Sequence, residues 1–410
     1  METRMSSNRH FVIIGGGLAG AKLAQSLRAQ DFDGRLTLLA AEDELPYERP
    51  PLSKQHLAGT QQLPDFTVDN SAWYRDHHVD LRLGTTAQAF DPVAKTVTLP
   101  DDSTLTYDKL ALATGSRARR LPLPGADAPN VYTLRTIGDS DILLQVLAAV
   151  QNLVIIGAGW IGLEVAAQAR QRGVEVTVLE TAEWPLVGVL GDRMGAMFAE
   201  LHREHGVDLQ LKAQVEAILT HEEIATGVRL TDGRVVPAQA ILVAVGAAPN
   251  IESALAAGLA VDSGVLVDES LRTSDPDVVA VGDIAEQLHP VLGRRIRVEH
   301  WATALNQPAV AAATMLDRPA VYDRLPYFFS DQYDLGMEYT GYVGRGDRTE
   351  LVVRGDLPGR EFVAFWLDEK RRVQAGMNVN VWNVTDRVKE LILSGEPVDP
   401  VRLADTGTPL

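Results

Sequence analysis

Short apolar runs, each followed by a glycine-rich turn and a helical stretch, recur along the chain. The first run, Phe11–Ile14, leads into residues 15–20 (GGGLAG); residues 21–30 then have helical composition, and residues 35–40 form a second apolar run. Apolar runs of this length bounded by glycine are typical of strands buried in a parallel sheet. The pattern therefore predicts a β-turn-α-β unit near the beginning of the chain.

The same unit recurs further along. An apolar run at 153–156 precedes residues 157–162 (GAGWIG), a helical stretch to about residue 172 and a second run at 175–179. A GxGxxG motif between a strand and a helix is typical of a dinucleotide-binding turn, and a purely structural glycine turn is the alternative. Two copies in this context favour two dinucleotide sites.

Each glycine of the motif has its own expected role. The first permits a tight turn, the second lets a pyrophosphate approach the backbone, and the third lets the helix pack against the strand. The phosphates then meet the free N–H groups and the positive dipole end of the helix. In the two copies these glycines are Gly15, Gly17 and Gly20, and Gly157, Gly159 and Gly162.

An acidic residue follows the second strand of each unit. Glu180 follows the run at 175–179, where a carboxylate accepts hydrogen bonds from ribose hydroxyls and repels a 2′-phosphate. Because no arginine follows within residues 181–184, NADH is favoured over NADPH. In the first unit Glu42 is the candidate, and a solvated acid in the run 42–44 is the alternative.

Three further apolar runs end in glycine, at residues 110–115 (LALATG), 241–246 (ILVAVG) and 278–283 (VVAVGD). They are interpreted as additional strand-plus-glycine segments that follow the two GxGxxG motifs, which we call the fingerprints. Asp283 closes the third run, and a helix N-cap is the alternative to a functional role for this residue.

Composition narrows the function classes. The 410 residues allow two to four domains, and 38 basic against 55 acidic residues give a net charge of −17, which argues against general nucleic-acid binding. A hydrophobic content of 46% with 23% charged residues excludes wholesale disorder. The chain has no cysteine, which excludes disulfides, thiolate catalysis, Cys-ligated iron–sulfur clusters and Cys-based zinc sites.

Other kinds of site are poorly supported. The first ten residues are polar and the charge-free window at 142–163 contains glutamines and glycines, so we expect a soluble, cytoplasmic protein without a membrane segment. His202 and His205 have helical spacing but no third ligand, and a solvated helix face is favoured over zinc. The aromatic stretch 327–333 lacks basic residues, which argues against a nucleic-acid platform.

Several motifs together resemble the FAD-dependent NADH:ferredoxin reductases of oxygenase systems. These are relatives of putidaredoxin reductase and of apoptosis-inducing factor in the pyridine nucleotide-disulfide oxidoreductase superfamily. The resemblance covers nearly the whole chain. Its motifs are residues 47–54 (YERPPLSK), 113–115 (ATG), 157–164 (GAGWIGLE), 273–276 (TSDP), 282–283 (GD), 298–301 (VEHW) and 329–333 (FSDQY).

The resemblance implies an α/β protein of glutathione-reductase type, with two Rossmann-like domains and a C-terminal α+β domain. Residues 1–119 and 248–326 would form the FAD domain, residues 120–247 the NAD domain and residues 327–410 the C-terminal domain. Alternating strand patterns and one helix at about 386–393 agree with the last boundary.

The resemblance also implies catalytic residues. Lys54 would lie near the flavin N5 and pair with Glu164, and Trp160 would cover the flavin face that the nicotinamide approaches. From the residues alone, a helix start, a helix-dipole partner and simple packing are the respective alternatives.

Fingerprints and resemblance together give two sets of cofactor contacts and no metal site. The expected FAD contacts are Gly15, Gly17, Leu18, Ala19, Gly20, Ala41, Glu42, Arg49, Lys54, Ala87, Ala113, Thr114, Gly115, Arg135, Gly282, Asp283 and Trp301. The expected NAD contacts are Gly157, Gly159, Trp160, Ile161, Gly162, Glu164, Glu180, Val245, Gly246 and Glu299.

Without cysteine, electrons must leave the flavin for an outside acceptor. The resemblance implies an iron–sulfur ferredoxin that feeds a cytochrome P450 or Rieske-type oxygenase. A redox-state sensor, or an NADH:quinone or NADH:oxygen oxidoreductase on the same fold, remains open, as does the oligomeric state. On so acidic a chain, docking an acidic ferredoxin requires a local basic patch. The candidates are Arg117, Arg119 and Arg120; Arg294, Arg295 and Arg297; and Lys370, Arg371 and Arg372.

Purified protein should be yellow and should hold FAD noncovalently, because the fingerprints supply dinucleotide sites and no cysteine is available to form a thioether. Absorbance spectroscopy before and after denaturation checks this, since the flavin should separate from the unfolded chain. A colourless protein that gains no flavin absorbance on incubation with FAD would contradict the assignment.

Overall fold

The computed structural model describes residues 8–410, which form two compact units. The first seven residues, part of the polar stretch on which the expectation of no secretory signal rests, lie outside the described residues. The first unit comprises the chain up to Arg49, Leu63–Arg117 and Ala248–Pro326. The second unit comprises Pro50–Gln62, Ala118–Ala247 and Tyr327–Leu410.

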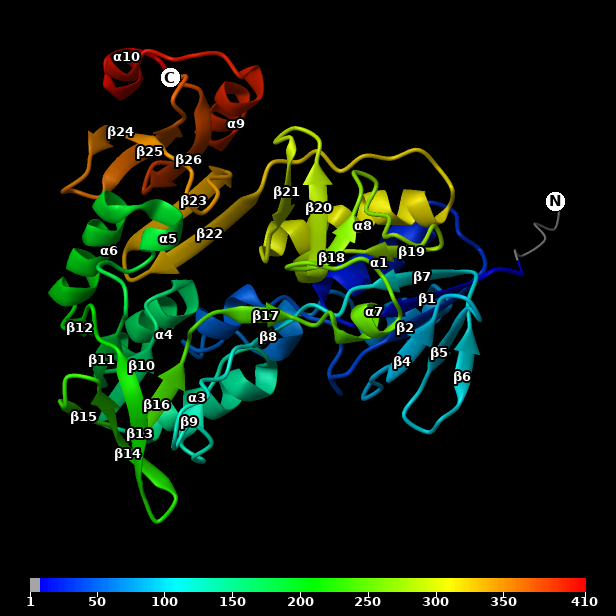
Figure 1. The fold of residues 1–410 in the computed structure, drawn as a ribbon, viewed down its shortest axis with the longest axis horizontal. Coiled ribbons are helices and arrows are strands. Elements are labelled where there is room, and N and C mark those ends of the chain that lie inside the picture. Colours follow the sequence, from blue (N-terminus) through cyan, green and yellow to red (C-terminus); the bar gives the residue numbers. More distant parts are fainter. Residues whose placement is uncertain (1–7) are drawn as a thin grey trace. The chain divides into compact units, whose positions relative to one another are not determined.

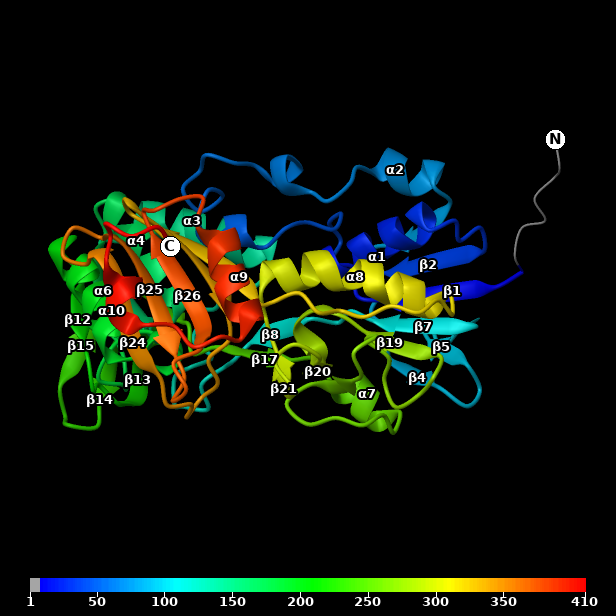
Figure 2. The ribbon, with the colours of Figure 1, turned by 90° about the horizontal axis from the view of Figure 1, so that it is seen from above.

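A five-stranded parallel sheet forms the centre of the first unit (Figure 1). Every residue of its middle strand is buried, which explains why that strand is continuously apolar after its first residue. Helices α1 (Leu18–Ala29) and α8 (Trp301–Met315) pack side by side in this unit (Figure 2). In order across the sheet, the strands are β19 (Val278–Ala280), β7 (Lys109–Leu112), β1 (His10–Ile14), β2 (Arg35–Leu39) and β3 (Val79–Arg82).

Shorter elements complete the first unit. Its other helical segments are η2 (Leu63–Phe66), α2 (Ser71–Asp76), α7 (Glu252–Ala256) and η3 (Gly282–Ile284). One small sheet contains β4 (Ala89–Asp91), β5 (Thr96–Thr98) and β6 (Thr104–Thr106), and another contains β18 (Val265–Val267), β20 (Ala285–His289) and β21 (Arg294–Arg297).

The second unit contains a parallel sheet with the same arrangement. Ile14 at the end of β1 pairs with Leu39 and Leu112, and Ile156 at the end of β10 pairs in the same way with Leu179 and Val243. The duplicated sequence pattern therefore produces the same strand neighbours twice. The strands are β12 (Asp208–Gln210), β11 (Glu175–Leu179), β10 (Asn152–Ile156), β16 (Ala240–Val243) and β9 (Val131–Tyr132).

Further elements surround this sheet. The helical segments are η1 (Pro50–Ser53), α3 (Ile137–Ala149), α4 (Trp160–Gln171), α5 (Val187–Leu190) and α6 (Asp192–Glu204). A three-stranded antiparallel sheet contains β13 (Val215–His221), β14 (Ile224–Leu230) and β15 (Val235–Pro237). Where the chain passes between the units, β8 (Ser116–Ala118) pairs with β17 (Ala247–Pro249).

The C-terminal part of the second unit is an antiparallel sheet with helices α9 (Thr385–Ser394) and α10 (Pro400–Ala404). The helix predicted at 386–393 is confirmed as α9, and Gly395 ends it with a φ of 61°, a conformation that glycine adopts without strain. The expected fold class is confirmed. The strands of the sheet, in order, are β22 (Tyr327–Gln332), β23 (Leu335–Gly341), β26 (Val373–Val379), β25 (Glu361–Leu367) and β24 (Glu350–Asp356).

Candidate active site

The two glycine-rich loops follow the central strands β1 and β10 directly. Helix α1 begins at Leu18 and helix α4 at Trp160, so each loop leads into the N-terminus of a helix. Gly17 and Gly159 occupy the N-cap positions without a side chain to satisfy the first N–H groups. Each loop therefore offers free donors and a positive dipole end to an anion.

In the first glycine loop, packing requires glycine at two positions of the motif but not at the remaining one. A Cβ on Gly15 would lie 2.1 Å from the Ala113 carbonyl oxygen, and a Cβ on Gly20 would lie 1.9 Å from the Gly15 carbonyl oxygen. A Cβ on Gly17 would meet no atom of the described residues within 4 Å, and its φ of −82° suits any residue. Folding alone does not require glycine at Gly17, whereas close approach of a pyrophosphate does.

The second loop repeats this division. A Cβ on Gly157 would lie 2.5 Å from the Ala244 carbonyl oxygen, and one on Gly162 would lie 2.2 Å from the Gly157 carbonyl oxygen. A Cβ on Gly159 would again meet no described atom within 4 Å, at a φ of −80°. The residues present in both loops thus fit a dinucleotide.

Glu180 lies against the second glycine loop. Its Oε2 accepts a hydrogen bond from the Ala158 N–H at 2.8 Å, and its Oε1 accepts one from the Ala182 N–H at 2.8 Å. These backbone donors fix the carboxylate beside the loop. Because each carboxylate oxygen has two acceptor positions, capacity for ribose hydroxyls remains.

Glu42 belongs to a polar cluster, so its interpretation as a merely solvated acid is wrong. Its Oε1 accepts a hydrogen bond from Arg49 Nη2 at 2.9 Å, and its Oε2 accepts one from the Tyr47 hydroxyl. Burial alone would lower the pKa of the Arg49 guanidinium, but Tyr47 and Glu42 raise it above its usual value. Sequence analysis missed the contribution of Tyr47.

Lys54 and Glu164 form a buried ion pair. Lys54 Nζ lies 2.8 Å from Glu164 Oε1, and the two side chains are 8% and 5% exposed. The Ser53 hydroxyl donates to Glu164 Oε2, and the Ser330 hydroxyl donates to Oε1 at 2.7 Å. A helix-dipole role would not require a buried carboxylate with three partners, so the alternative for Glu164 does not explain its setting.

The segment that carries Lys54 is held by helices of the second unit. The Ser140 hydroxyl donates to the Leu52 carbonyl at 2.7 Å, and His56 Nε2 lies 2.8 Å from Asp141 Oδ1. A third hydrogen bond joins Arg172 Nη2 to the Leu57 carbonyl at 2.6 Å. These contacts explain why Pro50–Gln62 clusters with the second unit although the chain on either side belongs to the first.

Trp160 packs within an aromatic cluster. Its ring meets Phe198 and Phe328 edge-on, with centroids 5.6 Å and 5.1 Å apart. Packing, the alternative for this residue, therefore accounts for part of its surface, and Trp160 as a whole is half-buried.

Three further expected contacts lie in the first unit. Asp283 lies inside η3, whose N-cap is Val281, so the N-cap interpretation of Asp283 is wrong. Trp301 Nε1 donates to Glu48 Oε2 at 3.0 Å. Glu299 pairs with Arg297.

The expected cofactor contacts divide between the two units. The first unit holds Gly15, Gly17, Leu18, Ala19, Gly20, Ala41, Glu42, Arg49, Ala87, Ala113, Thr114, Gly115, Gly282, Asp283, Glu299 and Trp301. The second unit holds Lys54, Arg135, Gly157, Gly159, Trp160, Ile161, Gly162, Glu164, Glu180, Val245 and Gly246.

His202 is fully buried, so its expected place on a solvated helix face is wrong. Its Nε2 lies 2.8 Å from Gln332 Oε1, and burial lowers the pKa of this imidazole to about 4. Within residues 8–410 no cluster of potential metal ligands is present, and no helix there is long and apolar enough to cross a membrane.

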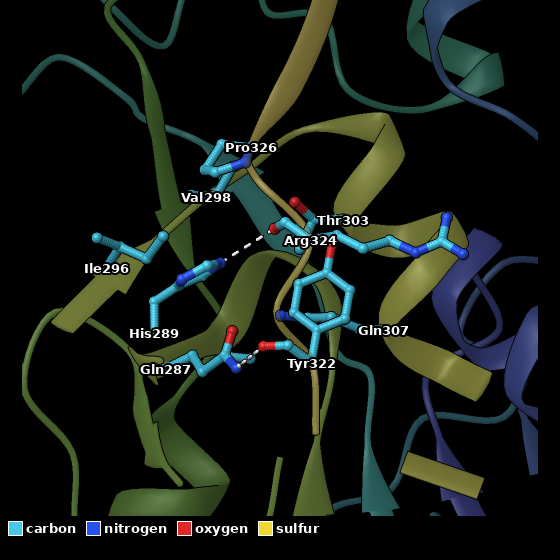
Figure 3. A pocket seen from close by; sticks show the side chains of 10 residues that line it. Gln287, His289, Ile296, Val298, Thr303, Gln307, Tyr322, Arg324 and Pro326 are labelled. Atoms are coloured by element: carbon cyan, nitrogen blue, oxygen red, sulfur yellow. Dashed lines mark hydrogen bonds between the residues drawn. The ribbon is translucent and has the colours of Figure 1, made fainter. Parts of the chain in front are cut away.

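A small pocket lies elsewhere in the first unit (Figure 3). His289 donates from Nε2 to the Arg324 carbonyl at 3.0 Å, and Gln287 donates to the Tyr322 carbonyl at 2.7 Å. None of the expected cofactor contacts lines this pocket, but Gln307, which does, accepts a hydrogen bond at 2.8 Å from the N–H of Gly282, an expected FAD contact.

Comparison with known proteins extends over the whole chain. Family models described as pyridine nucleotide-disulphide oxidoreductase and as reductase C-terminal match residues 9–307 and 327–410. The ferredoxin–NAD(+) reductase component of an anthranilate 1,2-dioxygenase system from Burkholderia cepacia is 40% identical over 96% of this chain and 97% of that protein. Putidaredoxin reductase from Pseudomonas putida is 36% identical over 99% of this chain and 97% of that protein.

A solved structure of putidaredoxin reductase in a covalent complex with putidaredoxin is also similar. Its TM-score is 0.94 at 36% identity, and the match covers 98% of this chain and 97% of that chain.

Two Rossmann-type sheets with matched glycine loops define an oxidoreductase that uses two dinucleotides. The chain belongs to the pyridine nucleotide-disulphide oxidoreductase family and, within it, is homologous to the ferredoxin reductases of oxygenase systems. The family implies FAD and NAD(H) as cofactors.

Replacing Gly159 by alanine should leave the fold intact and weaken NADH binding at least tenfold, because the added methyl group meets no protein atom but occupies the approach of the pyrophosphate. Thermal unfolding, FAD absorbance and titration with NADH measure these effects. Gly162→Ala is the matched control, since its Cβ would collide with the Gly157 carbonyl and should lower the melting temperature. Equal destabilisation by both substitutions would contradict this division of roles.

Proposed function

We propose that this chain is a ferredoxin–NAD(+) reductase that passes electrons from NADH through FAD to a [2Fe–2S] ferredoxin, which in turn supplies a cytochrome P450 or Rieske-type oxygenase. The observation that carries the proposal is the pair of matched glycine loops in a chain without cysteine. Two loops supply sites for two dinucleotides. Because no thiol can take the electrons, the final acceptor must be another molecule.

The named relatives support this choice of acceptor. One serves an anthranilate dioxygenase system as its ferredoxin–NAD(+) reductase component, and another has been solved in a complex with putidaredoxin. Both are similar to this chain over nearly its full length. A disulfide acceptor within the chain, which the family description allows, is excluded by the absence of cysteine.

We assign FAD to the loop at Gly15–Gly20 and NADH to the loop at Gly157–Gly162. The division into an FAD domain, an NAD domain at 120–247 and a C-terminal domain at 327–410 remains a prediction, as does the cytoplasmic location. Glu42 with Arg49 would hold the ribose end of FAD, and Glu180 would hold the adenosine ribose of NADH.

Bound FAD would supply the chemistry, accepting a hydride from NADH and releasing electrons singly. The chain's own contribution is charge and orientation. Lys54 carries a buried positive charge that Glu164 fixes in place, and this cation would stabilise negative charge on a reduced ring. Ser53 and Ser330 donate hydrogen bonds to the same carboxylate and so orient it toward Lys54.

Docking of a ferredoxin requires a cationic surface on an acidic chain. Several cations of the candidate clusters already pair with acids, for example Arg117 with Glu252 and Arg372 with Asp368. Lys370 and Arg371, at the exposed turn between β25 and β26, have no acidic partner among residues 8–410 and are our choice for docking.

NADH should be preferred to NADPH by roughly a hundredfold in kcat/KM, because the Glu180 carboxylate repels a 2′-phosphate at a cost of a few kcal/mol. Steady-state kinetics with each cofactor and ferricyanide measure the ratio. Glu180→Arg should narrow or reverse the preference, and Glu183→Arg, which changes the same charge nearby, is the control. Equal use of both cofactors by the unmodified protein would sink the assignment of Glu180.

NADH-dependent reduction of cytochrome c should be slow and should rise steeply when a [2Fe–2S] ferredoxin is added. The gain should weaken with salt, because the screening length falls to about 8 Å near 0.15 M. Exchanging Lys370 and Arg371 for glutamine should slow ferredoxin coupling and leave ferricyanide reduction intact, since that small oxidant needs no docked protein.

Other acceptors decide between the remaining functions. Rapid turnover with oxygen or a quinone, without acceleration by several unrelated ferredoxins, would make the chain an oxidase or quinone reductase. A long-lived reduced complex that no acceptor oxidises would instead favour a redox-state sensor.

A further inference from the structure

Behind the Lys54–Glu164 pair, polar side chains continue into the interior of the second unit. The Ser330 hydroxyl contacts Glu164, Gln332 Nε2 lies 3.2 Å from the Ser330 hydroxyl, and His202 Nε2 lies 2.8 Å from Gln332 Oε1. Ser330, Gln332 and His202 are 1%, 1% and 0% exposed. An apolar set would fill this space without the cost of removing polar groups from water, so the polar set calls for an explanation.

The hydrogen bonds of this set have one direction. Gln332 Oε1 can only accept, so His202 donates from Nε2; Gln332 Nε2 then donates to Ser330, whose single hydroxyl hydrogen goes to Glu164. If the amide of Gln332 were reversed, the Ser330 hydroxyl would face two acceptors with one hydrogen. Every donor in the series therefore points toward the carboxylate.

We infer that Ser330, Gln332 and His202 form a hydrogen-bond relay that holds the Glu164 carboxylate aimed at Lys54, which makes His202 a positioning residue for flavin reduction. The inference rests on the proposed function, because that function places Lys54 beside the flavin. Donors directed at a carboxylate favour its charged form, and a buried network in which each member is satisfied holds a single geometry.

The state of His202 agrees with this relay. Burial lowers its pKa to about 4, so the ring is neutral at pH 7 and carries its one N–H on Nε2. The Tyr333 hydroxyl lies 3.5 Å from Nδ1, the acceptor nitrogen of that tautomer. His205, which stacks on Tyr333, also lowers the pKa of His202 by charge repulsion.

The charged groups around the carboxylate come from several elements. Lys54 follows η1, and Asp331 lies beside Ser330 on β22. Desolvation and Glu164 raise the pKa of Asp331, and Lys54 opposes them. Without the relay, Glu164 would keep Lys54 and the Ser53 hydroxyl as partners, but its Oε1 would lose its fixed donor while the Asp331 carboxyl group remains nearby.

The test compares FAD-loaded His202→Phe, which loses the donor, with His202→Gln, which keeps an amide donor. In His202→Phe, stopped-flow reduction of the flavin by NADH should slow about tenfold at pH 7. The midpoint of the acid limb of its pH–rate profile should move to higher pH by about one unit. The KM for NADH should change less than twofold. His202→Gln should recover most of the rate.

A second readout does not depend on activity. The infrared band of a protonated carboxyl group, identified by its loss in Glu164→Gln, should appear at higher pH in His202→Phe than in the unmodified protein. Nitrogen-15 NMR of the imidazole should show the Nε2–H tautomer of His202. If His202→Phe does not fold, Gln332→Leu, which has a similar side-chain volume, should show the same shift of the pH profile and of the carboxyl band.

His289→Phe is the matched control. His289 is also buried and donates from Nε2, but to a backbone carbonyl in the first unit. The His289→Phe variant should show any loss of stability that comes from replacing a buried histidine, and its pH profile should be unchanged. An unchanged pH profile and carboxyl band in folded His202→Phe would overturn the relay, as would equal impairment of His202→Gln. If the unmodified protein itself is not reduced by NADH, the proposed function fails, and the infrared and NMR results still decide the relay.

Discussion

The buried carboxylate of Glu164 determines which residues must lie beside it in the second unit. Glu164 is 5% exposed, and a carboxylate in that environment is tolerated only with a cation and enough donors to replace water. Removing one partner from such a pair typically costs about 3–5 kcal/mol. Lys54, Ser53 and Ser330 therefore have to be present together, and the segments that carry them have to be held in register with α4.

That requirement links three distant parts of the chain. The segment Pro50–Gln62 supplies the lysine, α4 supplies the carboxylate and β22 supplies the serine. Contacts of α3 and α4 with the first segment, through Ser140 and Arg172, complete the arrangement. The antiparallel C-terminal sheet is thereby joined to helix α4 by the Ser330–Glu164 hydrogen bond as well as by the aromatic contact of Trp160 with Phe328.

Sequence analysis predicted the local parts of this design well. Continuous apolar runs mark buried parallel strands, and glycine spacing marks the loops, so both β-turn-α-β units could be located with errors of a few residues. It failed where the environment depends on remote neighbours. Ser330 contacts Glu164 across 166 positions and Gln332 contacts His202 across 130. Periodicity in a helix gives no signal that β22 will cover His202, so its burial could not be predicted.

The anchoring of Pro50–Gln62 has a consequence for domain exchange between related reductases. Two of its three main anchors end on backbone carbonyls, those of Leu52 and Leu57, and are donated by Ser140 and Arg172. The segment's own side chains contribute through Ser53 and Lys54, which bond to Glu164, and through His56, which pairs with Asp141. A chimera cut at the predicted boundary of the FAD domain, at residue 119, would separate Lys54 from the residues that hold it. Chimeras in which residues 50–62 are exchanged together with residues 118–247 would preserve the Lys54–Glu164 pair.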